Sequence, residues 1–328
     1  MKRASIILIF FTVLLSGQLL KTVDRSMLYR LSDNEYYSYN KPNWGTPFSN
    51  VPVDFVKFYE IGFTKKNIPA MVLIGVSTAF MIINDEDILV SVQEFSEDIG
   101  LDRENNLKTL ISIDGKNIFR APTDLSSSLY YIGDGWLHIS IAASFLTYGS
   151  ITSDNRALQT ASQLAEGLMT TGITTQFLKH ITGRESPSVR TRDGGRWIPF
   201  PNQIDYHENV PHYDAYPSGH LATAMMTYTV IHENYPEYKF IKPLSYIAMG
   251  LLSYQMINNG VHWISDYPLS IGIGYLFGKI AVDRGRRSVA ANEINGRKVE
   301  NEAHYGIKLF PYLSPYGDLG ITATYSLH

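Results

Sequence analysis

The strongest constraint on the fold is a series of apolar segments with helical spacing that recurs along most of the chain. Between residues 154 and 180, apolar side chains repeat at intervals of three and four, which is the pattern of an amphipathic helix. Similar segments cover residues 68–84, 135–148, 217–235, 244–257 and 263–282. Most are no longer than a buried core helix, and Gly, Pro, Ser or Tyr interrupts the apolar runs. We therefore expect an all-α protein, a compact helical bundle rather than a bundle of membrane spans.

The segment at residues 68–84 is apolar almost all round, which predicts a helix surrounded by protein or by lipid. Three acidic residues, at positions 85–87, predict its end. Residues 88–101 then favour a separate amphipathic helix. Residues 102–128 contain Gly, Pro, Asn and Asp, which is typical of a loop with short structured pieces.

Charge and cysteine content exclude some partners and sites. The formal net charge of the 328 residues is −3, so the protein has no general basic field and we expect no nucleic-acid partner. An anionic substrate would have to meet local positive charge. The chain has no Cys, which excludes disulfides and thiolate metal sites.

The first residues have the order of a secretory signal peptide. Lys2 and Arg3 precede an apolar run at residues 4–15, and the small residues Ser16 and Gly17 follow. The run is short for a membrane span. We expect residues 1–20 to be a signal peptide or an N-terminal anchor, and the protein to be exported to the periplasm or another extracytoplasmic space.

The rest of the chain divides into three parts by composition. Residues 21–66 are polar and rich in Tyr, Asn and Pro, which predicts an extended lead-in segment. Residues 67–283 contain the helical segments and form the predicted domain. Residues 284–328 are a polar linker and tail, in which alternating stretches at 305–313 and 321–327 predict a β-hairpin appendage.

Residues suited to chemistry gather at three places. Lys179 lies in the last turn of one predicted helix, and Pro217-Ser218-Gly219-His220 begins another, where free N–H groups form an anion site. His262 and Asp266 lie four residues apart, so in a helix the carboxylate could hold the imidazole in one tautomer.

Each place alone has an ordinary structural explanation: a cation at a helix C-terminus, a capped core helix and a surface His–Asp pair. No third or fourth ligand stands at a spacing that would favour zinc.

Together the three places resemble the superfamily of type 2 phosphatidic acid phosphatases, bacterial acid phosphatases and vanadium haloperoxidases. The family's motifs are Lys, six residues, Arg-Pro; then Pro-Ser-Gly-His; then Ser-Arg, five residues, His, three residues, Asp. Here they begin at Lys179, Pro217 and Gln255, in the same order, and the resemblance covers residues 67–283. It implies a helical phosphatase domain of that kind.

The resemblance also implies roles for these residues. His262 would attack phosphorus, Asp266 would orient it, and His220 would protonate the leaving oxygen and later activate water. Lys179, Ser218 and the Gly219 N–H would hold the phosphoryl oxygens. No metal or other cofactor is implied, and the reaction is hydrolysis of a phosphate monoester or diphosphate through a phosphohistidine.

Two departures from the family concern phosphate binding. Ser186 and Met256 stand where the family has arginines. Losing one such charge-stabilising donor commonly costs about a hundredfold in rate. Arg184 is two residues from the first vacant position, and we expect it to take part of the lost role, although a solvated loop charge is the alternative. Asn258 and Asn259, beside the second position, are further local donors.

Two other functions stay open at this point. The same anion pocket could hold vanadate, as in the haloperoxidases, although the two missing arginines disfavour a permanently bound oxyanion. The second open function is binding of a phosphorylated lipid or glycan without turnover.

The resemblance implies a phosphorylated lipid or small molecule as the substrate, and a lipid would bring association with a membrane surface. The aromatic residues of the loop at 183–216 could contact an apolar tail, or could fasten the loop to the domain. They are Trp197, Phe200, Tyr206, Tyr213 and Tyr216.

Overall fold

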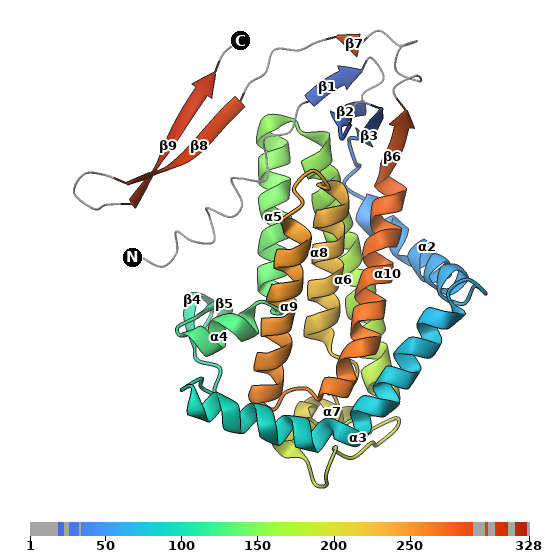
Figure 1. The fold of residues 1–328 in the computed structure, drawn as a ribbon, viewed down its shortest axis with the longest axis vertical. Helices are drawn as coiled ribbons and strands as arrows, with labels where there is room; N and C mark the ends of the chain where they lie inside the picture. Colours follow the sequence, from blue (N-terminus) through green and yellow to red (C-terminus); the bar gives the residue numbers. More distant parts are fainter. Residues whose placement is uncertain are drawn as a thin grey trace.

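The computed structural model describes residues 19–22, 26–32, 34–290, 299–300, 306–313 and 319–326. Nearly all of the predicted signal peptide or anchor lies outside these residues, so export stays a prediction. Five helices stand side by side and form the body of the protein (Figure 1): α5 (Gly135–Thr152), α6 (Asn155–Thr182), α8 (Gly219–Asn234), α9 (Ile241–Asn258) and α10 (Tyr267–Gly285). The prediction of a compact helical bundle is confirmed.

The bundle packs tightly where α8 crosses α10. A Cβ added to Gly274 of α10 would lie 2.2 Å from the Ala222 carbonyl oxygen of α8, so only glycine allows this approach. Around it, fully buried Leu164, Met226 and Val230 belong to one apolar cluster between α6 and α8. This packing fixes the ends of α6, α8 and α10 relative to one another.

Helix α6 begins and ends where the sequence predicts. The Asp154 side chain accepts a hydrogen bond from the Ala157 N–H at 2.8 Å, which caps the N-terminus. Gly183 ends the helix with φ of +56°, and a Cβ there would lie 1.9 Å from the Ile198 carbonyl oxygen. The chain can therefore turn back sharply after Lys179, and the loop at 183–216 folds onto the end of the bundle.

Helix α3 is one continuous helix, Ile68–Asp98, so the predicted end at residues 85–87 is wrong. The acidic residues do not break it because Asp85 is buried and forms an ion pair with Arg184, described below. In Figure 1, α3 runs obliquely away from α2 and then across the lower end of the bundle.

The lead-in segment is only partly extended. Thr46–Gly62 forms helix α2, which packs on α10 through Phe55 and Phe58: their ring centroids lie 5.8 and 4.5 Å from that of Phe277. Aromatic packing against the bundle provides the stability that the polar composition did not suggest.

The rest of the lead-in contributes to a small antiparallel sheet with strand order β6-β3-β2-β1-β7. Its strands are β1 (Leu19–Thr22), β2 (Ser26–Arg30), β3 (Glu35–Asn40), β6 (Arg286–Ala290) and β7 (Val299–Glu300). Tyr29 donates to Asp154 at 2.7 Å, and Tyr39 donates to the Asn234 side chain at 3.1 Å, so buried hydroxyls fasten the sheet to the bundle.

Two hairpins complete the described structure. Strands β4 (Leu107–Ile113) and β5 (Lys116–Pro122) are joined at Asp114-Gly115, both with positive φ, and helix α4 (Leu125–Tyr131) follows. The predicted C-terminal hairpin is present as β8 (Gly306–Leu313) paired with β9 (Leu319–Ser326).

Candidate active site

The lower end of the bundle brings the three sequence motifs together. The Ser218 N–H donates to the Asp266 carbonyl at 3.3 Å, which joins the start of α8 to the segment before α10. A Cβ on Gly219 would lie 3.9 Å from Lys179 Nζ, and the ring centroids of His220 and His262 are 5.8 Å apart. Residues that are 87 positions apart in the sequence therefore line one site.

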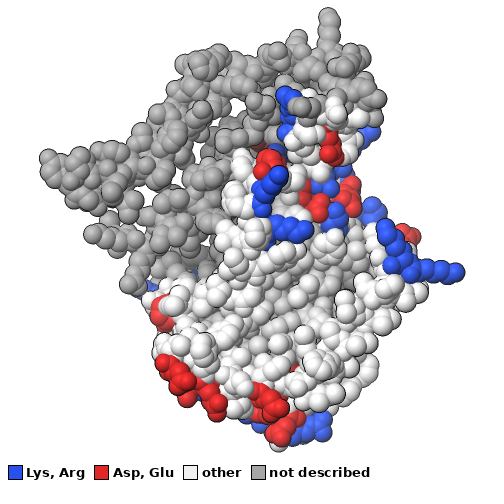
Figure 2. All heavy atoms as spheres, viewed as in Figure 1, with Lys and Arg blue, Asp and Glu red and all other residues white. Residues whose placement is uncertain are grey.

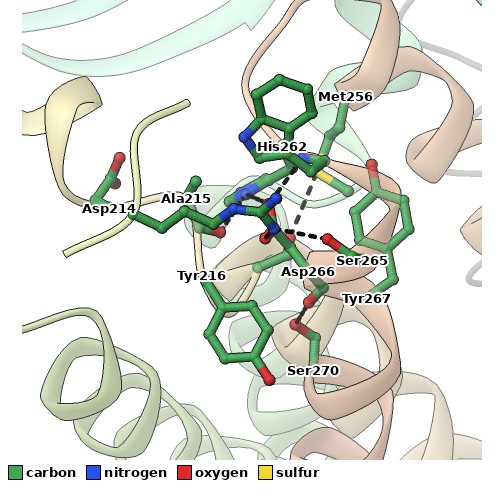
Figure 3. Close-up of polar contacts among 12 residues, drawn as sticks. Asp214, Ala215, Tyr216, Met256, His262, Ser265, Asp266, Tyr267 and Ser270 are labelled. Atoms are coloured by element: carbon green, nitrogen blue, oxygen red, sulfur yellow. Dashed lines mark hydrogen bonds and ion pairs between the residues drawn. The ribbon is translucent and has the colours of Figure 1, made fainter. Parts of the chain in front are cut away.

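His262 is held through one ring nitrogen. Its Nδ1 lies 2.7 Å from the Ala215 carbonyl oxygen and 3.5 Å from Asp266 Oδ2 (Figure 3). A carbonyl oxygen can only accept, so Nδ1 carries a proton, and in the neutral imidazole Nε2 keeps its lone pair. Nε2 is buried and has no hydrogen-bond partner among the described residues. A free basic nitrogen of this kind suits a nucleophile.

Asp266 is the last residue of the short 3-10 helix η4 (Ile264–Asp266), just before α10. Its side chain is fully buried, and Oδ2 accepts a hydrogen bond from the Trp263 N–H at 2.7 Å. The carboxylate therefore lies beside His262 in a fixed orientation, although the carbonyl of Ala215 is the nearer acceptor.

His220 contacts a residue that no sequence motif indicated. The hydroxyl of Tyr130, on α4, lies 2.9 Å from His220 Nε2, and the two rings are 4.9 Å apart. Burial raises the pKa of Tyr130, so its hydroxyl stays protonated. Burial lowers the pKa of His220 well below its usual range, and His262 and Lys179 add to this effect. His220 is thus neutral in the absence of substrate.

Lys179 is the cation nearest to the N-terminus of α8. Its Nζ forms an ion pair of 3.1 Å with Asp214 Oδ2, and the Lys179 side chain is only 9% exposed. The ammonium group that the resemblance assigns to phosphate binding is therefore already paired with a carboxylate.

Ser218 caps α8, as its position in the sequence suggests. Its Oγ accepts a hydrogen bond from the Leu221 N–H at 3.3 Å and donates to Met256 Sδ at 3.7 Å. Met256 is fully buried. A thioether sulfur is a weak acceptor, so the hydroxyl is free to turn toward a stronger one.

The other donors near the vacant arginine positions are already used. Asn258 donates to the Asp102 carbonyl at 2.9 Å, and Asn259 donates to the Arg103 carbonyl. Both amides hold the chain that follows α3.

Arg184 is fully buried and its guanidinium faces carboxylates. Nη1 binds Asp266 Oδ1 at 2.5 Å and Nη2 binds Asp85 Oδ2 at 2.6 Å. Only Nε lacks a partner among the described residues. This geometry differs from the expected one, in which the guanidinium faces phosphate, because both of its terminal nitrogens already have anionic partners.

The positive charges near the site are balanced by carboxylates. Lys179 and Arg184 are the cations, and Asp85, Asp214 and Asp266 are the carboxylates paired with them. Within the described ranges, no group of three or more His, Asp and Glu side chains is placed to hold a metal ion.

The aromatic residues of the loop at 183–216 pack on α6 or on one another, with one exception. Tyr206 is buried and stacks on His180 with ring centroids 4.1 Å apart, and Trp197 packs on Tyr216 at 5.2 Å. Phe200 is the exception, at 75% exposed.

Comparison with known proteins agrees with the motifs. Residues 160–288 match the model of the PAP2 superfamily. The match spans all three PAP2 motifs and confirms the resemblance seen in the sequence.

A solved structure is also similar, the crystal structure of "the first transmembrane PAP2 type phosphatidylglycerolphosphate phosphatase from Bacillus subtilis". The identity is 15%, the TM-score is 0.39, and the match covers 72% of this chain and 94% of that chain. No curated protein matches the chain.

Proposed function

We propose that the protein is a phosphatase that hydrolyses a phosphorylated lipid through a phosphohistidine at His262. The observation that carries the proposal is the state of His262: Nδ1 donates to the Ala215 carbonyl, and Nε2 is unengaged within the described chain and faces the same site as His220 and Lys179. The match to the PAP2 superfamily supports the same reaction class.

In the first step, the Nε2 lone pair of His262 attacks phosphorus and the bond from phosphorus to the leaving oxygen breaks. His220 gives a proton to that oxygen. Because burial lowers the pKa of His220, the ring takes up this proton when the substrate binds. The negative charge of the substrate favours the imidazolium. Tyr130 holds the ring in place.

In the second step, water attacks the phosphorus of the phosphohistidine and gives its proton to His220. Phosphate leaves and the His262 lone pair is restored. Lys179, the Ser218 hydroxyl and the Gly219 N–H at the start of α8 stabilise the charge on the phosphoryl oxygens. Phosphate must first displace Asp214 from Lys179.

A lipid substrate is supported by exposed apolar side chains on α6 and on the loop that follows it. Ile173 and Phe177 of α6 are 52% and 65% exposed, and they lie within two turns of Lys179. Phe200 and Ile204 of the neighbouring loop are also exposed, and the Phe200 N–H bonds to the Ile181 carbonyl at 3.2 Å. Exposed apolar side chains of this kind suit contact with an acyl or prenyl chain.

The surface of the whole domain favours association with a membrane. Among the described residues, one helix, Ile68–Asp98, is long and apolar enough to cross a bilayer, and 6% of its apolar window is buried in the structure. Figure 2 shows a broad face without Lys, Arg, Asp or Glu, with charged residues above and below it. Exposed apolar side chains on this helix, Leu73, Phe80 and Ile83 among them, would promote aggregation in water, whereas lipid would cover them.

Haloperoxidase activity is disfavoured by the same charges. A vanadate ion held as a permanent cofactor would need local positive charge, and both Lys179 and Arg184 are already paired with carboxylates.

Phosphate release by the purified full-length protein tests the proposal. The panel contains lipid phosphates and soluble monoesters, each with and without detergent. We expect the wild type to prefer a lipid phosphate and His262→Ala to lose at least about a thousandfold in kcat, as for loss of a nucleophile. His207→Ala, an exposed histidine outside the site, is the matched control. Activity that survives in His262→Ala would overturn the phosphohistidine mechanism.

A further inference from the structure

Three buried charged side chains form a cluster behind His262. The side chains of Asp85, Arg184 and Asp266 are each 0% exposed, and two ion pairs of 2.6 and 2.5 Å join them. The guanidinium carbon of Arg184 also lies over the rings of Trp197 and Trp263, at 4.8 and 5.3 Å from their centroids. Desolvating three charges is unfavourable, so such a cluster is weak evidence for a role in stability alone.

Arg184 holds both groups that contact His262 Nδ1. Its carbonyl oxygen accepts a hydrogen bond from the Ala215 N–H at 3.0 Å, and the Ala215 carbonyl is the acceptor for His262. Its Nη1 donates to Asp266 Oδ1. The other carboxylate oxygen, Oδ2, lies 3.5 Å from His262 Nδ1. A shift of Arg184 would move both partners of the imidazole together.

Asp85 fixes Arg184 from the far side. Its Oδ2 accepts hydrogen bonds from Arg184 Nη2 and from Ser265 Oγ, both at 2.6 Å, and its Oδ1 accepts from the Ser265 N–H at 3.1 Å. Ser265 immediately precedes Asp266 in η4. Helix α3 therefore binds, through Asp85, both Arg184 and the backbone next to Asp266.

We propose that Asp85 and Arg184 are positioning residues for the nucleophile, acting on His262 through Asp266 and Ala215. The proposal rests on the proposed phosphatase function. It gives Arg184 a role different from phosphate binding, and it makes the docking of α3 a condition for an ordered active site. Side chains that aim a reacting group raise kcat rather than substrate affinity.

Steady-state kinetics separate positioning from phosphate binding. Asp85→Asn keeps the shape and, through its amide oxygen, the contact with the Ser265 N–H, but it removes the charge and the oxygen that accepts from Arg184 Nη2. We expect kcat to fall at least about tenfold with KM within about twofold. Arg184→Met should lower kcat about a hundredfold. Arg184→Lys keeps the positive charge but not the two planar N–H donors of the guanidinium, so its kcat should lie between those of the wild type and Arg184→Met. Asp87→Asn, an exposed acid on the same helix, should equal the wild type.

A double-mutant cycle tests whether Asp85 acts through Asp266. In an Asp266→Asn background the carboxylate that Arg184 holds is gone, so Asp85→Asn should lower kcat by less than about twofold further. Equal losses in both backgrounds would show that Asp85 does not act through Asp266, which would overturn the proposal.

Binding measurements give the same comparison without turnover. Orthovanadate can form a bond to His262 Nε2, whereas inorganic phosphate needs only the oxygen-binding groups. Calorimetry should show a vanadate Kd about tenfold higher in Asp85→Asn, with the phosphate Kd within about twofold of the wild type.

A phosphate Kd or KM that rises in Arg184→Met while kcat stays constant would show that Arg184 binds phosphate and that the positioning role is wrong. Unchanged kcat and vanadate Kd in Asp85→Asn would also overturn it. If the wild type hydrolyses no phosphate ester, the proposed function fails, while the vanadate comparison still decides the positioning role.

Discussion

In the proposed reaction, Asp214 competes with phosphate for Lys179. Its carboxylate pairs with Lys179 at 3.1 Å, and it is 27% exposed, so it competes with an incoming phosphoryl group from an accessible position. A charge-assisted contact of this kind contributes about 1 kcal/mol when partly exposed. We expect Asp214→Asn to lower KM about threefold to tenfold and to leave kcat within about twofold. A raised KM would show that Asp214 helps to bind substrate instead.

Met256 occupies the position of a family arginine, and its surroundings decide what a restored arginine would do. It is fully buried in the apolar cluster with Leu252 and Trp263, and its sulfur accepts from Ser218. A guanidinium there would be overpacked and would lack a buried anion, which costs about 1–3 kcal/mol from overpacking alone.

Met256→Arg should therefore lower the melting temperature and the activity, and Met256→Leu, the matched control, should change both only slightly. A large gain in phosphatase rate in Met256→Arg would contradict this view and would show that the site has lost a ligand that it can still use.

The sequence identified the residues of the three motifs. It did not identify the residues whose side chains or backbone contact those motif residues in the folded structure. Lys179, Ser218, His220 and His262 could be found because each lies at a helix end with family spacing. Asp85, Tyr130 and Ala215 carry no such signal, since their contacts with the site come from tertiary packing across 47 to 180 positions of sequence. Arg184 was found, but its surroundings were not, because buried carboxylates cannot be told from solvated ones in a sequence.

At the scale of elements, α3 shows why local pattern was insufficient. Three acids in succession usually end an apolar helix, yet only Asp85 faces inward, where Arg184 balances its charge. The glycine and charge pattern around residues 102–128 likewise concealed a hairpin, although Asp114-Gly115 is a recognised turn pair. The long helix α6, which has clear caps and a regular apolar stripe, was predicted well.

Helices α2 and α6 meet at a buried acid whose titration should affect stability. Glu166 is 2% exposed and accepts a hydrogen bond from Asn50 at 2.6 Å. Burial raises the pKa of Glu166 from 4.5 to about 7, against the opposing effects of Asn50 and Lys57. The folded state thus holds this proton more tightly than the unfolded state. Stability should fall as the pH rises from about 4.5 to 7, by about 3 kcal/mol for this group.

Glu166→Gln removes that dependence while keeping the contact with Asn50. We expect its melting temperature to exceed that of the wild type at pH 8 and to match it at pH 5. A wild-type advantage at pH 8 would mean that the carboxylate is stabilising and that the pKa of Glu166 is not raised.

For the whole molecule, the exposed stripe on α3 indicates where lipid would lie. Leu73, Val76, Phe80 and Ile83 recur at helical spacing, and each is between 62% and 81% exposed. Leu73→Asp/Phe80→Asp should weaken binding to phospholipid vesicles at least about tenfold in a flotation assay, with unchanged turnover of a soluble substrate in detergent. Ile113→Asp, at a position on β4 that is 58% exposed, is the control. Unchanged vesicle binding would place the membrane contact elsewhere.

The central claim is a covalent phosphate on His262, and trapping it is the most direct test. With p-nitrophenyl phosphate the leaving group needs no proton, so His220→Ala should still be phosphorylated but should hydrolyse the intermediate slowly. Rapid quenching of this variant should yield a phosphoenzyme that is labile in acid, stable in alkali and assigned by mass spectrometry to His262, and none in His220→Ala/His262→Ala. A phosphoenzyme at another residue, or hydrolysis by His262→Ala at the wild-type rate, would contradict the account.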